Sequence, residues 1–138
     1  IPNMVEKTLR FPGHAKLISK EIESGKIIPG NKINLQRLFK IWRLLPGELE
    51  FTILDVIIET EEKTHNYFLF DETNLKENTS SMARTTGYTA SATIDILAQN
   101  IFIEKGVFPP EKVGSKSKVT DFLVNHLRRR DILLKKII

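Results

Sequence analysis

The chain has 138 residues, a length that fits one domain, and 41% of its residues are hydrophobic, which is enough to bury a core. Its formal net charge of +4 is small and its basic residues are dispersed, so we do not expect nucleic acid as a partner. The absence of cysteine excludes disulfides, thiolate catalysis and zinc–thiolate sites.

The first 46 residues predict one strand and two helices. Residues 4–10 alternate apolar and polar side chains, which predicts a short strand ended by Pro12 and Gly13. Apolar residues at helical spacing predict a helix over residues 14–24. An apolar stripe over residues 35–45 predicts a second helix, with Asn34 as its N-cap.

The remaining residues predict a hairpin, two helices and a last strand. Residues 51–60 are β-branched and apolar on both faces, which predicts a central strand covered on both sides, and residues 67–70 are the returning strand. Apolar periodicity predicts helices over residues 84–101 and 119–127, and residues 132–138 read as a strand.

The predicted order is therefore β-α-α-β-β-α-α-β. This order indicates an α/β (α+β) fold, with a mixed β-sheet on which helices pack, in a single domain over residues 1–138. The half-exposed strands at both ends indicate missing neighbours or a partner subunit. Because the chain starts with Ile1 and shows neither a signal peptide nor an apolar run of roughly 20 residues, we expect a piece of a larger cytoplasmic protein without a membrane partner.

Several kinds of site are excluded by missing motifs. Neither GxGxxG nor GxxxxGK[ST] occurs, so we expect no cofactor-binding residues here, and a GxSxG elbow is absent. His14, His65 and His126 are far apart without a metal-ligand spacing, so no metal is expected; His65 reads as a solvated loop residue and His126 as a half-buried structural one. The basic run 128–130 is best explained as cations at a helix C-terminus, ahead of nucleic-acid contact.

Residues 8–14 (TLRFPGH) form the first segment that composition does not explain. A predicted strand ends in Arg10, the chain turns at Pro-Gly, and a helix begins at His14. Ligands of α/β proteins gather at such strand-to-helix turns, and an arginine can hold a carboxylate through two parallel hydrogen bonds. The alternative, which stays open, is that Arg10 fastens the turn to a neighbouring carboxylate of the protein.

Residues 81–88 (SMARTTGY) are the second such segment, with hydroxyls and an arginine where a helix begins. Free N–H groups and the helix dipole make such a place suitable for an anion. The alternative is plain N-capping by Ser81, Thr85 or Thr86. The residue types alone favour capping.

Three stretches together resemble the saccharopine dehydrogenase family: residues 3–14 (NMVEKTLRFPGH), 81–88 (SMARTTGY) and 106–111 (GVFPPE). Their order and spacing extend the resemblance over nearly the whole chain. The resemblance implies a two-domain enzyme, in which a Rossmann domain binds NAD or NADP. A second domain covers the amino-acid substrate and often forms a homodimer. The chain resembles the later part of this second domain, so the nucleotide-binding domain would lie outside it.

The resemblance also implies an activity and its residues. The parent protein would be an oxidoreductase acting on the CH–NH group of an amino acid such as a lysine derivative, or of a related amine. Arg10 would bind a substrate carboxylate and Phe11 would line the same pocket, with His14, Arg84, Thr85 and Thr86 as further substrate-binding residues. Whether this chain alone is an enzyme stays open, and we expect no NAD binding or turnover from it. The glycine expected in the hairpin after Glu59 is missing. The alternative is a non-catalytic ligand-binding or dimerisation module of the same fold.

Overall fold

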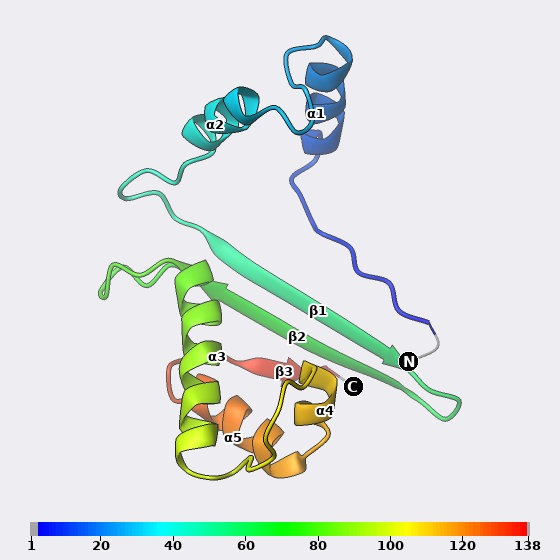
Figure 1. Ribbon diagram of the computed structural model, residues 1–138, viewed down its shortest axis with the longest axis vertical. Coiled ribbons are helices and arrows are strands. Elements are labelled where there is room, and N and C mark those ends of the chain that lie inside the picture. Colours follow the sequence, from blue (N-terminus) through cyan, green and yellow to red (C-terminus); the bar gives the residue numbers. More distant parts are fainter. Residues whose placement is uncertain (1–2, 138) are drawn as a thin grey trace. The chain divides into compact units, whose positions relative to one another are not determined.

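The computed structural model describes residues 3–137. They divide into two compact units, residues 3–46 and 47–137, and each unit is described by itself (Figure 1). The prediction of one domain over residues 1–138 stays a prediction. The α+β fold is confirmed, since five helices and a three-stranded sheet occur among the described residues.

The first unit contains helices α1 (His14–Glu23) and α2 (Lys32–Ile41). The strand predicted over residues 4–10 does not form, because residues 3–11 have no regular structure. Alternating apolar and polar side chains would give a strand one apolar and one polar face. A strand forms, however, only where a neighbouring strand supplies the hydrogen bonds between them.

Helix α2 begins three residues earlier than its apolar stripe indicated. The N-cap is Asn31, whose side-chain oxygen accepts hydrogen bonds from the backbone N–H groups of Ile33 at 3.0 Å and Asn34 at 3.4 Å. Asn34, predicted to be the cap, instead donates through its side-chain amide to the carbonyl of Lys26. The helix ends at Trp42, its C-cap, short of the predicted residue 45.

The second unit contains an antiparallel sheet in the order β1-β2-β3. Strands β1 (Phe51–Glu59) and β2 (Thr64–Glu72) form a hairpin that pairs Phe51 with Glu72 and Glu59 with Thr64. Strand β3 (Leu134–Lys136) pairs with β2. The predicted mixed sheet is therefore wrong within residues 3–137, because both strand pairs that the structure describes are antiparallel.

Helices cover one face of this sheet. They are α3 (Ser81–Ala98) and α5 (Ser117–Arg128), and a short helix that was not predicted, α4 (Pro110–Gly114), packs against α5. Leu69 of β2 packs with Leu127 and Ile132 in one buried cluster, and Ile96, Phe102 and Val119 form a second cluster between α3 and α5. The core of the unit thus lies between the sheet and these helices.

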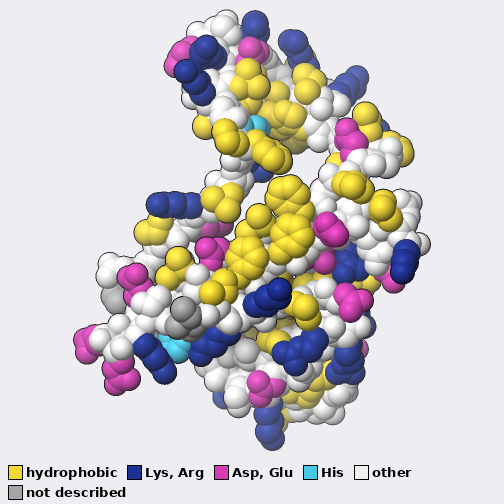
Figure 2. All heavy atoms as spheres, turned by 180° about the vertical axis from the view of Figure 1, so that it is seen from behind, with side chains coloured by type: hydrophobic (Ala, Val, Ile, Leu, Met, Phe, Trp, Pro, Cys, Tyr) yellow, Lys and Arg dark blue, Asp and Glu magenta, His cyan; other side chains and the backbone are white. Residues whose placement is uncertain are grey.

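The opposite face of the sheet carries apolar side chains that stay exposed (Figure 2). Partners directly opposite in an antiparallel pair share a face, so Ile53 and Phe70 lie on the side away from Leu69. Ile53 is 41%, Ile57 58% and Phe70 49% exposed. The prediction that β1 is a central strand covered on both sides is wrong within the described residues, where β1 is an edge strand.

Candidate functional site

Arg10 lies just before a tight turn that starts α1. Gly13 adopts a left-handed φ of 88°, which a glycine reaches without the clash of a Cβ atom. The N–H of His14 donates to the carbonyl of Phe11 at 3.1 Å and closes the turn. Arg10 is exposed, and its guanidinium has no hydrogen bond or ion pair with any residue in the described part of the chain. It is thus available to donate to an external carboxylate.

The other two candidates of this turn differ in exposure. Phe11 is 75% exposed. His14, the first residue of α1, is half-buried, and its ring lies against the indole of Trp42 with 5.6 Å between centroids and a 40° angle between planes. The structure therefore brings Arg10, Phe11 and His14 together on one short turn of the first unit.

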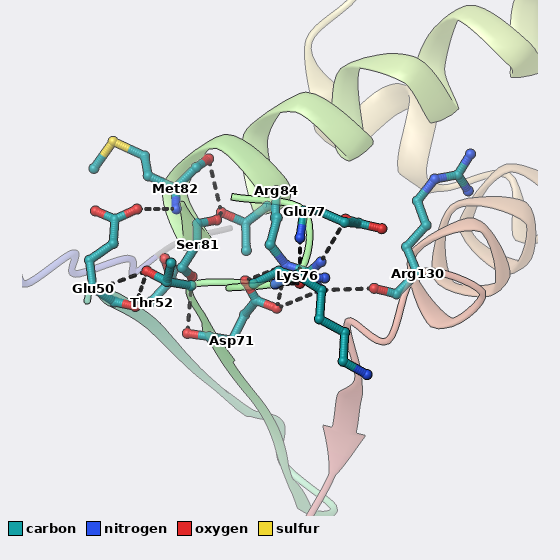
Figure 3. Close-up of polar contacts among 12 residues, drawn as sticks. Glu50, Thr52, Asp71, Lys76, Glu77, Ser81, Met82, Arg84 and Arg130 are labelled. Carbon is teal, nitrogen blue, oxygen red and sulfur yellow. Dashed lines mark hydrogen bonds and ion pairs between the residues drawn. The ribbon is translucent and has the colours of Figure 1, made fainter. Parts of the chain in front are cut away.

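Arg84 lies in the second unit, where it forms a buried ion pair with Asp71 (Figure 3). The two side chains are 6% and 4% exposed, and the Arg84 Nη2 to Asp71 Oδ1 distance is 3.2 Å. Arg84 Nε also donates to the same carboxylate, and Nη2 donates to the carbonyl of Arg130 at 2.9 Å. Hydrogen bonding to Asp71 raises the pKa of Arg84, although burial opposes this. The guanidinium thus joins β2, α3 and the end of α5.

The first N–H groups of α3 are already occupied by protein oxygens. Ser80, the N-cap, accepts from the N–H of Ala83 at 3.2 Å. The Glu50 carboxylate accepts from the N–H of Met82 at 2.8 Å (Figure 3). The carboxylate of Glu50 therefore holds the place at this helix start that the sequence offered to an external anion.

The hydroxyls in this segment also bond within the protein. Ser81 is buried and donates to the carbonyl of Asp71 at 2.9 Å, so the cap is Ser80 and not Ser81. Thr85 donates to the Ser81 carbonyl at 2.9 Å, and Thr86 to that of Met82. Neither threonine caps the helix. A role for Arg84, Thr85 and Thr86 in substrate binding stays a prediction.

His126 is a structural residue in a polar cluster between α3 and α5. It is 3% exposed, so it is buried more deeply than the sequence indicated. Its Nε2 lies 3.1 Å from the hydroxyl of Ser91, and its Nδ1 lies 3.4 Å from Asp95 Oδ2. Burial lowers the pKa of His126, Arg130 lowers it further, and Asp95 opposes the change. The Ser91 hydroxyl also bonds the Tyr88 carbonyl within its helix, and it is not arranged as a nucleophile.

The remaining polar predictions have simple outcomes. Arg130 Nη1 donates to the carbonyl of His126 at 3.0 Å and Arg129 Nε to that of Asn125 at 3.4 Å, so the basic run does close the helix. His65 is half-buried within β2 and not in a loop. Its partial burial lowers its pKa, and the charges of Lys136 and Lys63 lower it further. Within residues 3–137 no group of three His, Asp or Glu side chains could hold a metal ion, and no helix is long and apolar enough to cross a membrane.

Three residues of these arrangements were missed in the sequence. No role was predicted for either Asp71 or Glu50. Their partners are 13 and 32 residues away, beyond any local pattern. Trp42 was assigned only to an apolar stripe. A signal for Asp71 existed, because a buried arginine at a helix start needs a carboxylate, but no spacing rule identifies which one.

The two groups of candidates lie in different units, Arg10, Phe11 and His14 in the first and Arg84, Thr85 and Thr86 in the second. Each group lies where a helix begins: the segment TLRFPGH leads into α1, and the segment SMARTTGY forms the start of α3. The family model of the saccharopine dehydrogenase C-terminal domain matches residues 1–133. That match covers all of these candidates and nearly the whole chain, so the chain belongs to the saccharopine dehydrogenase C-terminal domain family.

Proposed function

We propose that this chain is the substrate-binding and dimerisation part of an NAD(P)-dependent oxidoreductase that acts on the CH–NH group of an amino acid or a related amine. Arg10 binds a carboxylate of the substrate, Phe11 forms a wall of the same pocket, and His14 borders it. Arg84, Thr85 and Thr86 contribute as a second group, through the shape of the α3 start. We place the parent protein in the cytoplasm and in amino-acid metabolism, such as that of lysine.

The observation that carries this proposal is the state of Arg10. An exposed guanidinium without a partner among the described residues, next to a tight turn, can form a bidentate pair with a carboxylate. Arg84 contrasts with it, because Asp71 and a carbonyl already use its donors. Charge-assisted recognition by this chain is therefore assigned to Arg10.

The nicotinamide cofactor is expected on the Rossmann domain of the same protein. The antiparallel sheet of the described residues supports this expectation, because dinucleotides commonly bind in the crevice at the carboxyl ends of parallel strands. The cofactor supplies hydride transfer, and the residues of this chain bind and orient the substrate.

Arg10 is tested in the protein that contains this chain, with saccharopine and NAD or NADP as substrates. A hydrogen bond to a charged group contributes about 1.5–3 kcal/mol, so Arg10→Gln should lower kcat/KM by roughly 10- to 150-fold. Arg10→Lys should recover only part of it, because lysine lacks the fork of donors. The control is Lys7→Gln, an exposed cation in the same segment. Equal kinetics of Arg10→Gln and Lys7→Gln would remove Arg10 from the site.

The proposed homodimer uses the exposed apolar face of the sheet. Large exposed apolar patches mark contact surfaces, and Ile53, Ile57 and Phe70 are all more than 40% exposed. Ile53→Glu should convert the dimer to monomers in light scattering coupled to size exclusion, whereas Glu61→Lys, in the hairpin turn, should not. A wild-type protein that elutes as a monomer contradicts this part of the proposal.

The second candidate function is a non-catalytic ligand-binding or dimerisation module. The many protein-internal bonds of the Arg84 segment favour it, because that segment serves the fold without any ligand. One result separates the two functions. Arg10→Gln lowers the turnover of the folded protein in the first, and it leaves the kinetics of the folded protein unchanged in the second.

A further inference from the structure

The contact between His14 and Trp42 joins the two ends of the first unit's helical segment. His14 is the first residue of α1, and Trp42 is the C-cap of α2. Their ring centroids are 5.6 Å apart. No described residue of this unit is buried, so neither helix is held by a packed core of its own. The ring pair is therefore one specific contact that fixes this end of α1 against the end of α2.

Polar bonds fix the opposite, loop end of the two helices. Lys26 forms an ion pair with Glu21 at 3.2 Å, and its carbonyl accepts from the Asn34 side chain. The N–H of Ile27 donates to the carbonyl of Glu21 at 3.0 Å. Polar bonds thus connect the two helices at the loop. At the other end, which carries the turn of residues 10–14, the ring pair connects them.

Trp42 also lines a groove of about 190 Å³ between the two helices. Its indole therefore both contacts the His14 ring and contributes to the lining of this groove. Trp42 is half-exposed, at 51%.

We propose that Trp42 is a positioning residue, which holds the His14 ring and thereby the turn of residues 10–14 in the geometry that binds substrate. Trp42 does not touch the substrate in this proposal, and it acts through His14. The inference rests on the proposed function, in which Arg10, Phe11 and His14 bind the substrate. It adds a specific residue on α2 that sets how rigidly that turn is presented.

The test is a double-mutant cycle in the protein that contains this chain, with saccharopine as the substrate. Aromatic pairs are worth about 0.5–1.5 kcal/mol, so Trp42→Leu should raise KM roughly 2- to 12-fold with little change in kcat. Trp42→Phe keeps a ring and should recover most of the loss. In a His14→Leu background, Trp42→Leu should have no further effect on KM. The matched control is Phe39→Leu, one turn earlier on α2 and 66% exposed, which should leave KM unchanged.

A second readout needs no activity. Trp42 is the only tryptophan of the 138-residue chain, so the tryptophan emission of this chain comes from Trp42 and responds to changes around its indole. His14→Leu should change the emission of the chain, and Phe39→Leu should not. Identical emission of wild type and His14→Leu, or additive KM effects in the cycle, overturns the inference. Unchanged kinetics of Arg10→Gln is a separate failure, of the proposed function, and leaves the emission result to decide the ring contact.

Discussion

The buried ion pair of Asp71 and Arg84 gives the sharpest prediction of stability. Removing one partner of a buried pair leaves an uncompensated charge and typically costs about 3–5 kcal/mol. Asp71→Asn keeps the shape of the side chain but removes the charge that faces the guanidinium at 3.2 Å. Glu77 is a weak substitute, because it lies 3.8 Å from Arg84 Nη1 and is 58% exposed. Because this second carboxylate still compensates part of the Arg84 charge, we expect a loss near the lower end of that range, about 3 kcal/mol.

This loss is large enough to measure by urea or thermal unfolding, followed by far-UV circular dichroism at pH 7.5. For a chain of this size 1 kcal/mol shifts Tm by roughly 3–5 °C, so Asp71→Asn should melt roughly 10–15 °C earlier. The matched control is Lys112→Met, which breaks an exposed pair with Glu104 and should change Tm little. The pair of Lys112 and Glu104 has a similar length, 3.3 Å, so the two variants compare the loss of a buried ion pair with the loss of an exposed one.

The double variant Asp71→Leu with Arg84→Met separates pairing from packing. Apolar residues of similar volume often replace a buried ion pair at little cost, so the double variant should be more stable than either single one. The carbonyl of Arg130 would lose its donor, which leaves a residual cost of about 1 kcal/mol. If the two single losses add in the double variant, or if Asp71→Asn melts with the wild type, the pair is not the stabilising contact that the geometry indicates.

Two further predictions concern pH and a helix cap. Burial and Arg130 lower the pKa of His126 in the folded chain, so folding favours the neutral ring. This contribution to stability is complete above about pH 6.5, the pKa of an unfolded histidine. It is lost as the pH falls from there toward the lower pKa of the folded state. The free energy of unfolding should be lower at pH 5.5 than at pH 7.5, and His126→Gln should make this difference smaller. The pKa of His65 is lowered as well, so the variant is compared with the wild type at both pH values. An equal loss of stability in the two proteins would contradict the prediction. Ser80→Ala removes the cap of the Ala83 N–H and should cost about 1 kcal/mol, whereas Ser80→Asp should keep the stability; equal melting of Ser80→Ala and wild type would count against the capping assignment.

The helices and the hairpin could be predicted from the sequence because their signals are local. Apolar periodicity locates α2, α3 and α5 to within a few residues, and β-branched runs locate β1. The family was also recoverable, since its three motifs are contiguous in sequence and the family match covers them. Helix ends were less certain, because Asn31 and Asn34 are equally good caps by residue type and only the backbone path selects Asn31.

The sequence by itself therefore determined which segments are helical, where the hairpin lies and to which family the chain belongs. Only the tertiary structure decided the fate of the polar residues. Arg84 and Arg10 look alike in their motifs, yet Arg84 meets Asp71 across β2 and α3, whereas Arg10 stays exposed. The strand expected at residues 4–10 is likewise missing. The physical reason is the same in each case: ion pairs and strand ladders need a partner that is distant in the chain, and no local pattern carries the position of that partner.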